Sequence, residues 1–254
     1  MLDQTILVTG ACGRIGFQTS LDLLQAGYSV VLSDINDDIL EKTLNRIPPE
    51  LHSRATLISA DVTSPESIEN MLQTSIQITK RIDGVVHSAY PRTTWSGLYF
   101  EDLDPNALFS DLIAQLGSAI VLSQKAVQLF RAQGSGSLIH ISSIQGIAAP
   151  KFEHYEGTSM SSTIGYTAIK AGIVGITKWL AKYTANSNIR VNCVTPGGII
   201  DNQDVHFQER YRKSCTSIGL LSPHHVSSAI VFLMSDQASA INGQNLVVDD
   251  GWSL

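Results

Sequence analysis

Residues 5–16, TILVTGACGRIG, lead from an apolar run into a glycine-rich turn. Gly10, Gly13 and Gly16 follow one another at intervals of three, where the run gives way to a predicted helix. Glycines in this context permit a tight turn, let the backbone approach a pyrophosphate, and let the helix pack closely on the strand. Free N–H groups at the start of the helix also favour phosphate. The stretch therefore predicts the first strand, turn and helix of a dinucleotide-binding fold.

The rest of the chain continues this alternation of strand and helix. Apolar runs that predict buried parallel strands fall at residues 5–9, 29–33, 56–60, 84–87, 137–142, 190–194 and 244–248. Amphipathic stretches predict helices at about 14–26, 36–46, 65–80, 105–132, 163–185 and 224–235. Alternation over residues 1–254 predicts one α/β domain, a Rossmann-type doubly wound parallel sheet of about seven strands flanked by helices.

Three long loops are expected to form the walls of a substrate site. Ligands of open parallel sheets bind beyond the carboxyl ends of the strands, and all three loops leave from that edge. They span residues of about 88–104, 144–162 and 196–222.

The composition excludes several classes of protein. The 254 residues carry a net charge of -6 without a cluster of Lys or Arg, which argues against nucleic-acid binding. No apolar run reaches the roughly 18 residues that span a bilayer, and the N-terminus lacks the pattern of a signal peptide. A cytoplasmic protein without a membrane partner is expected. Cys12, Cys193 and Cys215 fit neither a disulfide framework nor a zinc site, so no metal is expected.

The second predicted strand ends in an acidic residue that bears on the choice of cofactor. Asp34 lies about twenty residues after the glycine turn, where a carboxylate binds a ribose 2′-OH and repels a 2′-phosphate, so NAD is preferred over NADP. Arg14 keeps NADP open, because it lies in the turn within reach of a 2′-phosphate. Asp61 and Val62 are expected at the adenine edge, with a turn before the next helix as the alternative role of Asp61. Cofactor contacts are also expected from Cys12, Ile15 and Ile35, although packing is the alternative role of Cys12.

Tyr166 and Lys170 are four residues apart on a predicted helix, so their side chains share one face. A free phenol has a pKa of about 10, and a nearby ammonium lowers it by stabilising the phenolate. A drop of roughly three units requires about 4 kcal/mol, which Lys170 and an oxidised nicotinamide together are expected to supply. Ser143 ends the preceding strand, and its hydroxyl is expected to bind the substrate oxygen. Its neighbour Ser142 is the alternative, since alternate strand residues face opposite ways and only one of the two can face the cofactor. Together they predict acid–base catalysis by a tuned phenol.

A second tyrosine competes for the catalytic role. Tyr155 lies twelve residues after Ser143, but the residue four positions beyond it is Ser159 and not a lysine. It precedes a run of small polar residues that is typical of a loop. Tyr166 is therefore the predicted catalytic residue, and Tyr155 is expected either to pack within the loop or to contact substrate.

These motifs together resemble the short-chain dehydrogenase/reductase family along the whole chain. The resemblance rests on TGACGRIG at 9–16, Asp34, DVT at 61–63, ISS at 141–143, YTAIK at 166–170, NCVTPGGI at 192–199 and NGQNLVVDDGWSL at 242–254. It implies that Ser143, Tyr166 and Lys170 carry the chemistry, with Lys170 also holding the nicotinamide ribose. It further implies a homodimer or homotetramer. The residues implied to border the nicotinamide are Pro196, Gly197 and Ile199.

The chain departs from the family pattern at several positions. The family usually has Asn-Asn-Ala-Gly where this chain has HSAY at 87–90; Ser88 and Ala89 are still expected to line the adenosine ribose. Gln115 takes the place of an asparagine that holds a proton-relay water, and the longer amide leaves two outcomes open: it keeps the water or displaces it. Arg14 stands where the family usually has glycine.

Two segments further resemble a bacterial branch of the family named for flagellin modification, whose genes accompany surface-glycan genes. They are HSAYPR at 87–92 and APKFEHYEGTSMSSTIGYTAIKAGI at 149–173. The resemblance implies a substrate derived from a sugar or sugar phosphate. Expected substrate contacts are Tyr90, Arg92 and Tyr155; Lys151 and His154 either contact an anionic group or are solvated loop residues.

The predicted activity is hydride transfer between a nicotinamide cofactor and a small-molecule secondary alcohol or ketone. Two alternatives remain at this point. One is an NAD-binding sensor or scaffold with little redox activity, suggested by Arg14, the HSAY stretch and Gln115. The other is a sugar epimerase or dehydratase that uses the same tyrosine and retains its NAD.

Overall fold

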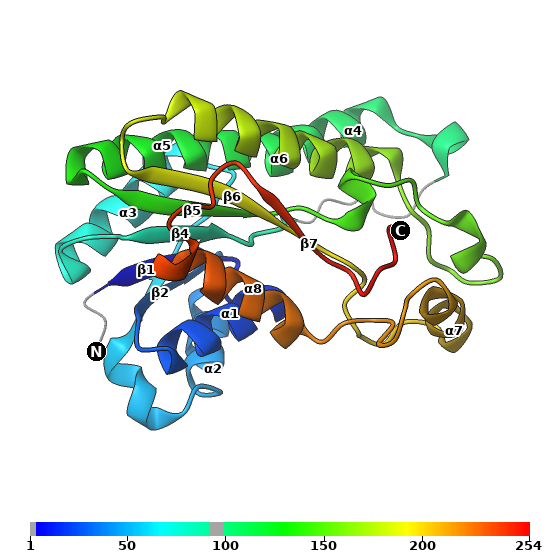
Figure 1. Cartoon of the computed structure of the whole chain (residues 1–254), viewed down its shortest axis with the longest axis horizontal. Helices are drawn as coiled ribbons and strands as arrows, with labels where there is room; N and C mark the ends of the chain where they lie inside the picture. The colour runs from blue at the N-terminus through cyan, green and yellow to red at the C-terminus, as the bar shows by residue number, and fades with distance from the viewer. Residues whose placement is uncertain (1–3, 92–98) are drawn as a thin grey trace.

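The computed structural model describes residues 4–91 and 99–254. Its centre is a seven-stranded parallel sheet in the order β3-β2-β1-β4-β5-β6-β7 (Figure 1). The strands are β1 Thr5–Thr9, β2 Ser29–Asp34, β3 Ala55–Ser59, β4 Gly84–His87, β5 Gly136–Ile141, β6 Ile189–Pro196 and β7 Asn245–Val248. The order reverses between β1 and β4, which creates the crevice where such sheets bind ligands. The predicted Rossmann-type sheet is confirmed.

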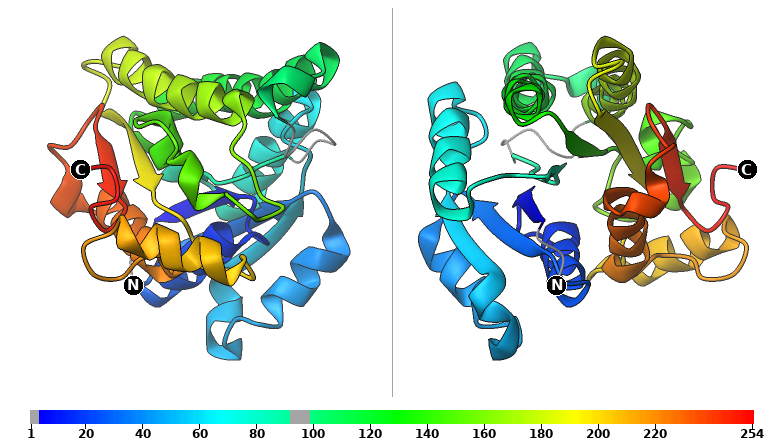
Figure 2. Two further views of the ribbon diagram at one scale, coloured as in Figure 1. Left: turned by 90° about the vertical axis from the view of Figure 1, so that its right-hand side faces the viewer. Right: turned by 60° about the vertical axis from the view of Figure 1, so that its left-hand side comes forward.

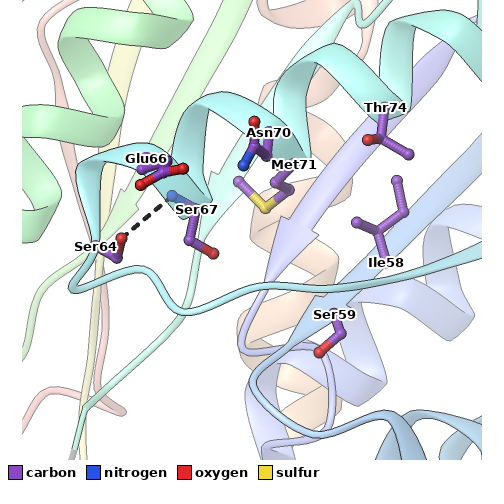
Figure 3. Close-up of a pocket in the computed structure, with 8 residues that line it drawn as sticks. All are labelled: Ile58, Ser59, Ser64, Glu66, Ser67, Asn70, Met71 and Thr74. Carbon is purple, nitrogen blue, oxygen red and sulfur yellow. Dashed lines mark hydrogen bonds between the residues drawn. The ribbon is translucent and has the colours of Figure 1, made fainter.

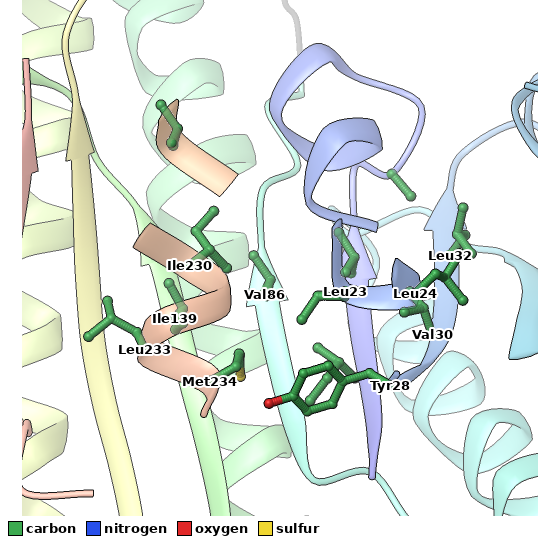
Figure 4. Close-up of a cluster of buried hydrophobic side chains, with 14 of the residues drawn as sticks. Leu23, Leu24, Tyr28, Val30, Leu32, Val86, Ile139, Ile230, Leu233 and Met234 are labelled. Carbon is green, nitrogen blue, oxygen red and sulfur yellow. The ribbon is translucent and has the colours of Figure 1, made fainter. Parts of the chain in front are cut away.

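Helices cover both faces of the sheet (Figures 1 and 2). They are α1 Arg14–Gln25, α2 Asp37–Leu44, α3 Pro65–Thr79, α4 Pro105–Asp111, α5 Ser118–Gln133, α6 Ile164–Tyr183, α7 Val205–Lys213 and α8 Pro223–Met234. On one face α1, α2 and α8 enclose an apolar core that includes Leu23, Leu40 and Ile230 (Figure 4). On the other face α3, α5 and α6 enclose a second core around Met71 and Phe130. The burial of both sheet faces explains the nearly continuous apolar runs of the strands.

Local capping explains where several helices begin. The Asn36 side chain accepts a hydrogen bond from the Ile39 N–H at 3.1 Å, and Ser64 accepts one from the Ser67 N–H at 3.2 Å. Pro65 then occupies the first position of α3, where its missing N–H has no helical partner to lose. The first turns of α2 and α3 are thereby fixed by polar side chains next to the carboxyl edge of the sheet.

The predicted loop at 196–222 is wrong in part, because it contains α7. The helix has little apolar content, and its buried residues are only Phe207 and Tyr211, one turn apart. Asp204 caps it by accepting a hydrogen bond from the His206 N–H at 2.8 Å. An Asp followed by two aromatic residues spaced by four was the available signal.

The single helix expected at about 105–132 is also interrupted. A π-helical turn, Leu112–Gly117, lies between α4 and α5. The whole stretch Pro105–Gln133 is long and apolar enough, by length and composition, to cross a membrane. In this fold, however, Leu122, Ala126 and Phe130 of α5 belong to the core beneath it. This pattern is that of a core helix in a globular protein.

Candidate active site

The glycine turn is closed too tightly for side chains at two positions. Gly10 has φ of +67°, and a Cβ on it would lie 2.6 Å from the Cα of Ala89. A Cβ on Gly16 would lie 2.1 Å from the Gly10 carbonyl oxygen. The N-cap of α1, Gly13, provides no side-chain cap, so the first-turn N–H groups are available to an anion. The turn therefore fits a pyrophosphate.

Asp34 lies directly against the glycine turn. Its Oδ2 accepts a hydrogen bond from the Cys12 N–H at 2.9 Å, and its Oδ1 accepts one from the Ile35 N–H at 2.8 Å. Burial is the main cause that raises the pKa of the Cys12 thiol to about 11, so Cys12 is neutral at pH 7. The carboxylate thus stands at the end of β2, in the place expected for a ribose-binding residue.

The two other predicted nucleotide segments also lie at the carboxyl edge. Asp61 makes the turn before α3, where its Oδ1 accepts hydrogen bonds from the Thr63 N–H at 2.8 Å and Oγ1 at 2.7 Å, which supports the turn role left open for it. Val62 is buried. Beyond β4, the Ser88 N–H donates to the Thr9 carbonyl at 3.2 Å, and Ala89 contacts Gly10 closely.

Ser143, Tyr166 and Lys170 meet at this same edge. Tyr166 and Lys170 are one turn apart on α6, whose N-cap Thr163 accepts a hydrogen bond from the Tyr166 N–H at 3.2 Å. Lys170 Nζ lies 5.6 Å from the centroid of the Tyr166 ring and donates to the Ile141 carbonyl at 3.1 Å. The Ser143 hydroxyl also faces the Tyr166 phenol and acts to lower its pKa. The predicted trio is therefore brought together.

The two adjacent serines point to different partners. Ser142 Oγ donates to the Lys170 carbonyl at 2.7 Å, so it fixes α6 against β5. Ser143 Oγ instead accepts from the Gln145 N–H at 3.3 Å and faces Tyr166. The preference for Ser143 over Ser142 agrees with this geometry.

Burial dominates the electrostatics of the tyrosine and the lysine. It raises the pKa of Tyr166 to about 12, with the Ser143 hydrogen bond acting in the opposite direction, and lowers the pKa of Lys170 to about 8. Lys170 is not among the causes of the shift in the Tyr166 pKa, and the drop expected from Lys170 together with an oxidised nicotinamide stays a prediction. A protonated phenol at neutral pH is suited to donate a proton. Lowering its pKa from about 12 to about 7 requires about 7 kcal/mol from further positive charge.

Tyr90 joins this group, although the family usually has glycine there. Its ring lies edge-on to the Tyr166 ring, with centroids 5.9 Å apart and planes at 71°. Lys170 Nζ lies 5.4 Å from the Tyr90 centroid, which is cation–π range. Tyr90 therefore covers Tyr166 and Lys170. Arg92, the other candidate in this segment, lies outside the described residues.

Gln115 lies in the π-helical turn and is buried. Its Nε2 donates to the Pro91 carbonyl at 3.3 Å, so its amide is tied to the segment that carries Tyr90. Its Oε1 is buried without a hydrogen-bond partner among the described residues. An orphaned acceptor of this kind suits an ordered water, and the predicted relay remains a prediction.

The segment after β6 carries the predicted nicotinamide residues. The Gly197 N–H donates to the Val248 carbonyl at 2.8 Å, which continues the β6–β7 pairing just beyond Pro196. Ile199 forms a parallel bridge with Leu221, and its carbonyl accepts from Gln203 Nε2 at 2.6 Å. This segment is therefore held at both ends above the sheet edge.

The insert before Tyr166 packs on α7 and on the C-terminal segment. His154 is buried, its Nε2 lies 2.9 Å from Ser214 Oγ, and burial is the main cause that lowers its pKa. Lys151 Nζ donates to the Trp252 carbonyl at 3.3 Å and lies 4.7 Å from the centroid of the Trp252 ring. His154 is therefore not a solvated loop residue, and Lys151 packs on Trp252; contact of either side chain with an anionic group stays a prediction.

Tyr155 packs within the insert, which is one of the two roles left open for it, and contact with substrate stays a prediction. Its ring packs 5.2 Å from the Phe207 centroid, and its hydroxyl accepts from Gln145 Nε2 at 3.1 Å. Ser162 Oγ in turn donates to Gln145 Oε1 at 2.6 Å. Gln145 was not predicted, although its place two residues after Ser143 was a signal. It connects Ser143 to Tyr155 and Ser162 of the insert.

A pocket of about 590 Å³ opens beside these residues. The expected loops 88–104 and 144–162 do meet here. The pocket is lined by Tyr99, Phe100, Glu101, Leu103, Pro150, Phe152, Tyr155, Glu156, Gly157, Thr158, Met160, Ser161, Ser162, Thr163, Ile164 and Thr167. Because Thr163 and Thr167 flank Tyr166 on α6, the pocket adjoins the predicted catalytic residue Tyr166.

A smaller hollow of about 310 Å³ lies between β3 and α3 (Figure 3). It includes Ser59, Ser64 and Asn70 and none of the predicted site residues. In residues 4–91 and 99–254, no group of three or more His, Cys, Asp or Glu side chains is arranged to hold a metal ion.

Comparison with known proteins places this site in a family. The profile described as enoyl-(acyl carrier protein) reductase matches residues 10–253. Post-translational flagellin modification protein A of Campylobacter coli is 40% identical over 253 residues, which cover 99% of each chain. 3beta-hydroxysteroid dehydrogenase 2 of Eggerthella lenta is 28% identical, over 98% of this chain and 95% of that protein.

A solved structure gives the same result for the fold. A short chain dehydrogenase from Leptospira borgpetersenii with bound NAD+ superposes with a TM-score of 0.87 at 27% identity, covering 99% of this chain and 93% of that one. With the profile match over nearly its whole length, the chain belongs to the short-chain dehydrogenase/reductase family.

Proposed function

We propose that the protein is an NAD-dependent oxidoreductase that interconverts a secondary alcohol and a ketone on a sugar-derived substrate. The observation that carries the proposal is the meeting of Ser143, Tyr166 and Lys170 at the crevice of the sheet, next to the glycine turn. When bound there, the nicotinamide would accept or donate the hydride. A cytoplasmic location and a single domain are part of the same proposal.

Each residue then has a defined role toward substrate. The Ser143 hydroxyl orients the substrate oxygen, and the Tyr166 phenol exchanges the proton with it. Lys170 supplies positive charge near the phenol and reaches the nicotinamide ribose. Tyr90 covers this pair and restricts the space beside the reacting carbon.

The remaining cofactor contacts follow the carboxyl edge from the glycine turn to the segment after β6. Asp34 binds the adenosine ribose, and the backbone around Gly10, Gly13 and Gly16 holds the pyrophosphate. The nicotinamide side is bordered by the segment 196–199, whose ends are held by β7 and Leu221. The steric closeness of the turn supports this arrangement, since only glycine fits at its two tightest points.

Replacing Asp34 tests the preference for NAD. We expect the wild-type protein to bind NADH at least about tenfold more tightly than NADPH, and Asp34→Asn to bring the two affinities within about threefold. Asparagine keeps an acceptor for the Cys12 N–H but loses the charge that repels a 2′-phosphate. Fluorescence titration with both cofactors measures the ratio. Asp38→Asn is the control: it removes a charge in the first turn of α2 and should leave the ratio of NADH to NADPH affinity unchanged. Equal affinities of the wild-type protein for the two cofactors would rule out the role of Asp34.

The substrate class is supported by the pocket and by a relative. The pocket combines aromatic rings with Ser and Thr hydroxyls, a lining that suits hydroxylated rings. The Campylobacter coli relative is named for flagellin modification, and we infer a similar place in surface-glycan synthesis for this protein.

A panel of substrates tests the activity. Purified protein with NAD+ would be assayed for NADH fluorescence against sugars, sugar phosphates and simple secondary alcohols, and in reverse with ketones. Net NADH from a sugar-derived alcohol is the expected result. NAD that co-purifies without net reduction would indicate an epimerase or dehydratase instead, and cofactor binding without any turnover would indicate a sensor.

The family resemblance also leads us to propose a homo-oligomer. Apolar side chains on the outer surface of the helices above the second core support it: Ile113 and Ile120 near α5, and Trp179 stacked on Tyr183 of α6. Exposed apolar side chains on these helices are candidates for an interaction surface between copies of the chain.

A further inference from the structure

One ion pair joins the two halves of the sheet across the crevice. Arg14 is the first residue of α1, directly after the glycine turn, and its guanidinium pairs with the Asp201 carboxylate in the segment between β6 and α7. β1 and β6 are separated by β4 and β5 in the sheet. Three strand spacings amount to about 14 Å, so the pair spans the place where ligands of such sheets bind.

Asp201 is held in position from its own side. Its N–H donates to Gln203 Oε1 at 2.7 Å, and Gln203 Nε2 donates back to the Ile199 carbonyl at 2.6 Å. Ile199 is in turn bridged to Leu221. The Asp201 carboxylate therefore lies in a turn that these contacts hold in place, and the Arg14 side chain extends to it.

Arg14 retains donors beyond the one used by Asp201. The ion pair engages Nη2, while a guanidinium has five N–H groups in a planar fork. About half of the Arg14 side chain is exposed. Since it begins the helix whose first turn presents free N–H groups, its remaining donors lie beside the anion site of the glycine turn.

We propose that Arg14 and Asp201 form a strap over the cofactor: Arg14 binds the pyrophosphate with its remaining N–H groups, and Asp201 is the positioning residue that keeps it there. The strap rests on the NAD binding in the proposed function. It couples occupancy of the glycine turn to the order of residues 199–213, which border the nicotinamide and the substrate insert. Neither member of the pair is part of the catalytic trio.

NADH affinities distinguish the strap from a competition between Asp201 and the pyrophosphate for Arg14. Arg14→Gln should weaken NADH binding by about tenfold, the size of one charge-assisted hydrogen bond, and Arg14→Lys should recover part of the loss. Asp201→Asn should weaken it by about threefold, because Arg14 loses its orientation. If Asp201 instead competed with the pyrophosphate for Arg14, Asp201→Asn would bind NADH more tightly, and that result would overturn the strap.

Hydrogen exchange gives a readout that does not depend on turnover. With saturating NADH, wild-type protein should exchange more slowly both in the glycine turn and in residues 199–213. Both Arg14→Gln and Asp201→Asn should keep the slowing in the turn and lose it in residues 199–213. Arg81→Gln is the matched control, since its ion pair with Asp83 at 2.6 Å lies at the opposite edge of the sheet; it should behave as wild type.

The outcomes separate the strap from the function on which it rests. Slowing at residues 199–213 that persists in both variants, or NADH that accelerates exchange there in wild type, would overturn the strap while leaving NAD binding intact. Wild-type protein that binds no NADH at all would overturn both. Circular dichroism of each variant establishes that an altered affinity does not come from misfolding.

Discussion

Tyr166→Phe is expected to reduce turnover by about 10²- to 10⁴-fold, the contribution of a positioned proton donor. The change removes one hydroxyl and keeps the ring, so the contacts with Tyr90 and the helix remain. NADH affinity should change by less than about threefold. Steady-state kinetics on the best substrate of the panel, with a separate cofactor titration, measures both effects.

The second tyrosine of the insert is the matched control for this experiment. Tyr155→Phe also removes one hydroxyl, but that hydroxyl is bound by Gln145, and the residue four positions after Tyr155 is Ser159 and not a lysine. We expect kcat within about tenfold of wild type and a change mainly in KM. A loss in Tyr155→Phe that matches or exceeds the loss in Tyr166→Phe would reassign the proton donor.

Acid should unfold the protein through two buried histidines. His87 Nδ1 lies 2.9 Å from Thr9 Oγ1, and His140 lies between Ser123 Oγ at 2.8 Å and Thr177 Oγ1 at 2.9 Å. Burial lowers the pKa of His87 to about 3 and that of His140 to about 4, and the positive charges of His140 and Lys170 add to the lowering at His87.

The direction of the pH effect follows from where the protons bind. The unfolded chain takes up a proton at each histidine below a pKa of about 6.5, whereas the folded protein does so only near pH 3 to 4. Their contribution to stability is therefore complete above pH 6.5 and is lost as the pH falls. At pH 4 the loss is about 3 kcal/mol for each, a large part of a typical free energy of unfolding.

Urea unfolding at pH 7 and pH 4.5 measures this loss. His87→Asn should remove about half of the difference between the two pH values, although it also lowers stability at pH 7 by the bond to Thr9. His206→Gln is the control, because that side chain is exposed. An unchanged pH dependence in His87→Asn would show that other groups drive the acid transition.

Much of the fold could be read from local patterns. The seven apolar runs correspond to the seven strands within one or two residues, because strands covered on both faces need continuous apolar sequence. The Tyr166–Lys170 spacing predicts a shared helix face, and α6 provides it. These features depend on neighbours in the sequence, which is why they could be predicted.

What escaped prediction depends on contacts between distant segments. α7 is polar and is stabilised through Phe207 and Tyr211 by the insert and Trp252, which lie far from it in the sequence. The pKa of Tyr166 follows from the burial of its ring, which the spacing to Lys170 does not contain. The partner of Arg14 lies 187 positions away, at Asp201.

The small core beneath the insert also has a consequence for how substrate preference changes between relatives. Ile144, Phe207, Tyr211 and Trp252 form it, with Tyr155 packed against them, so four stretches of chain share one set of contacts. A chimera that takes only the insert from a relative would lose the packing partners of the buried insert side chains, which lie on α7 and around Trp252. Specificity should therefore transfer only as a block, when the insert, α7 and the residues around Trp252 are exchanged together.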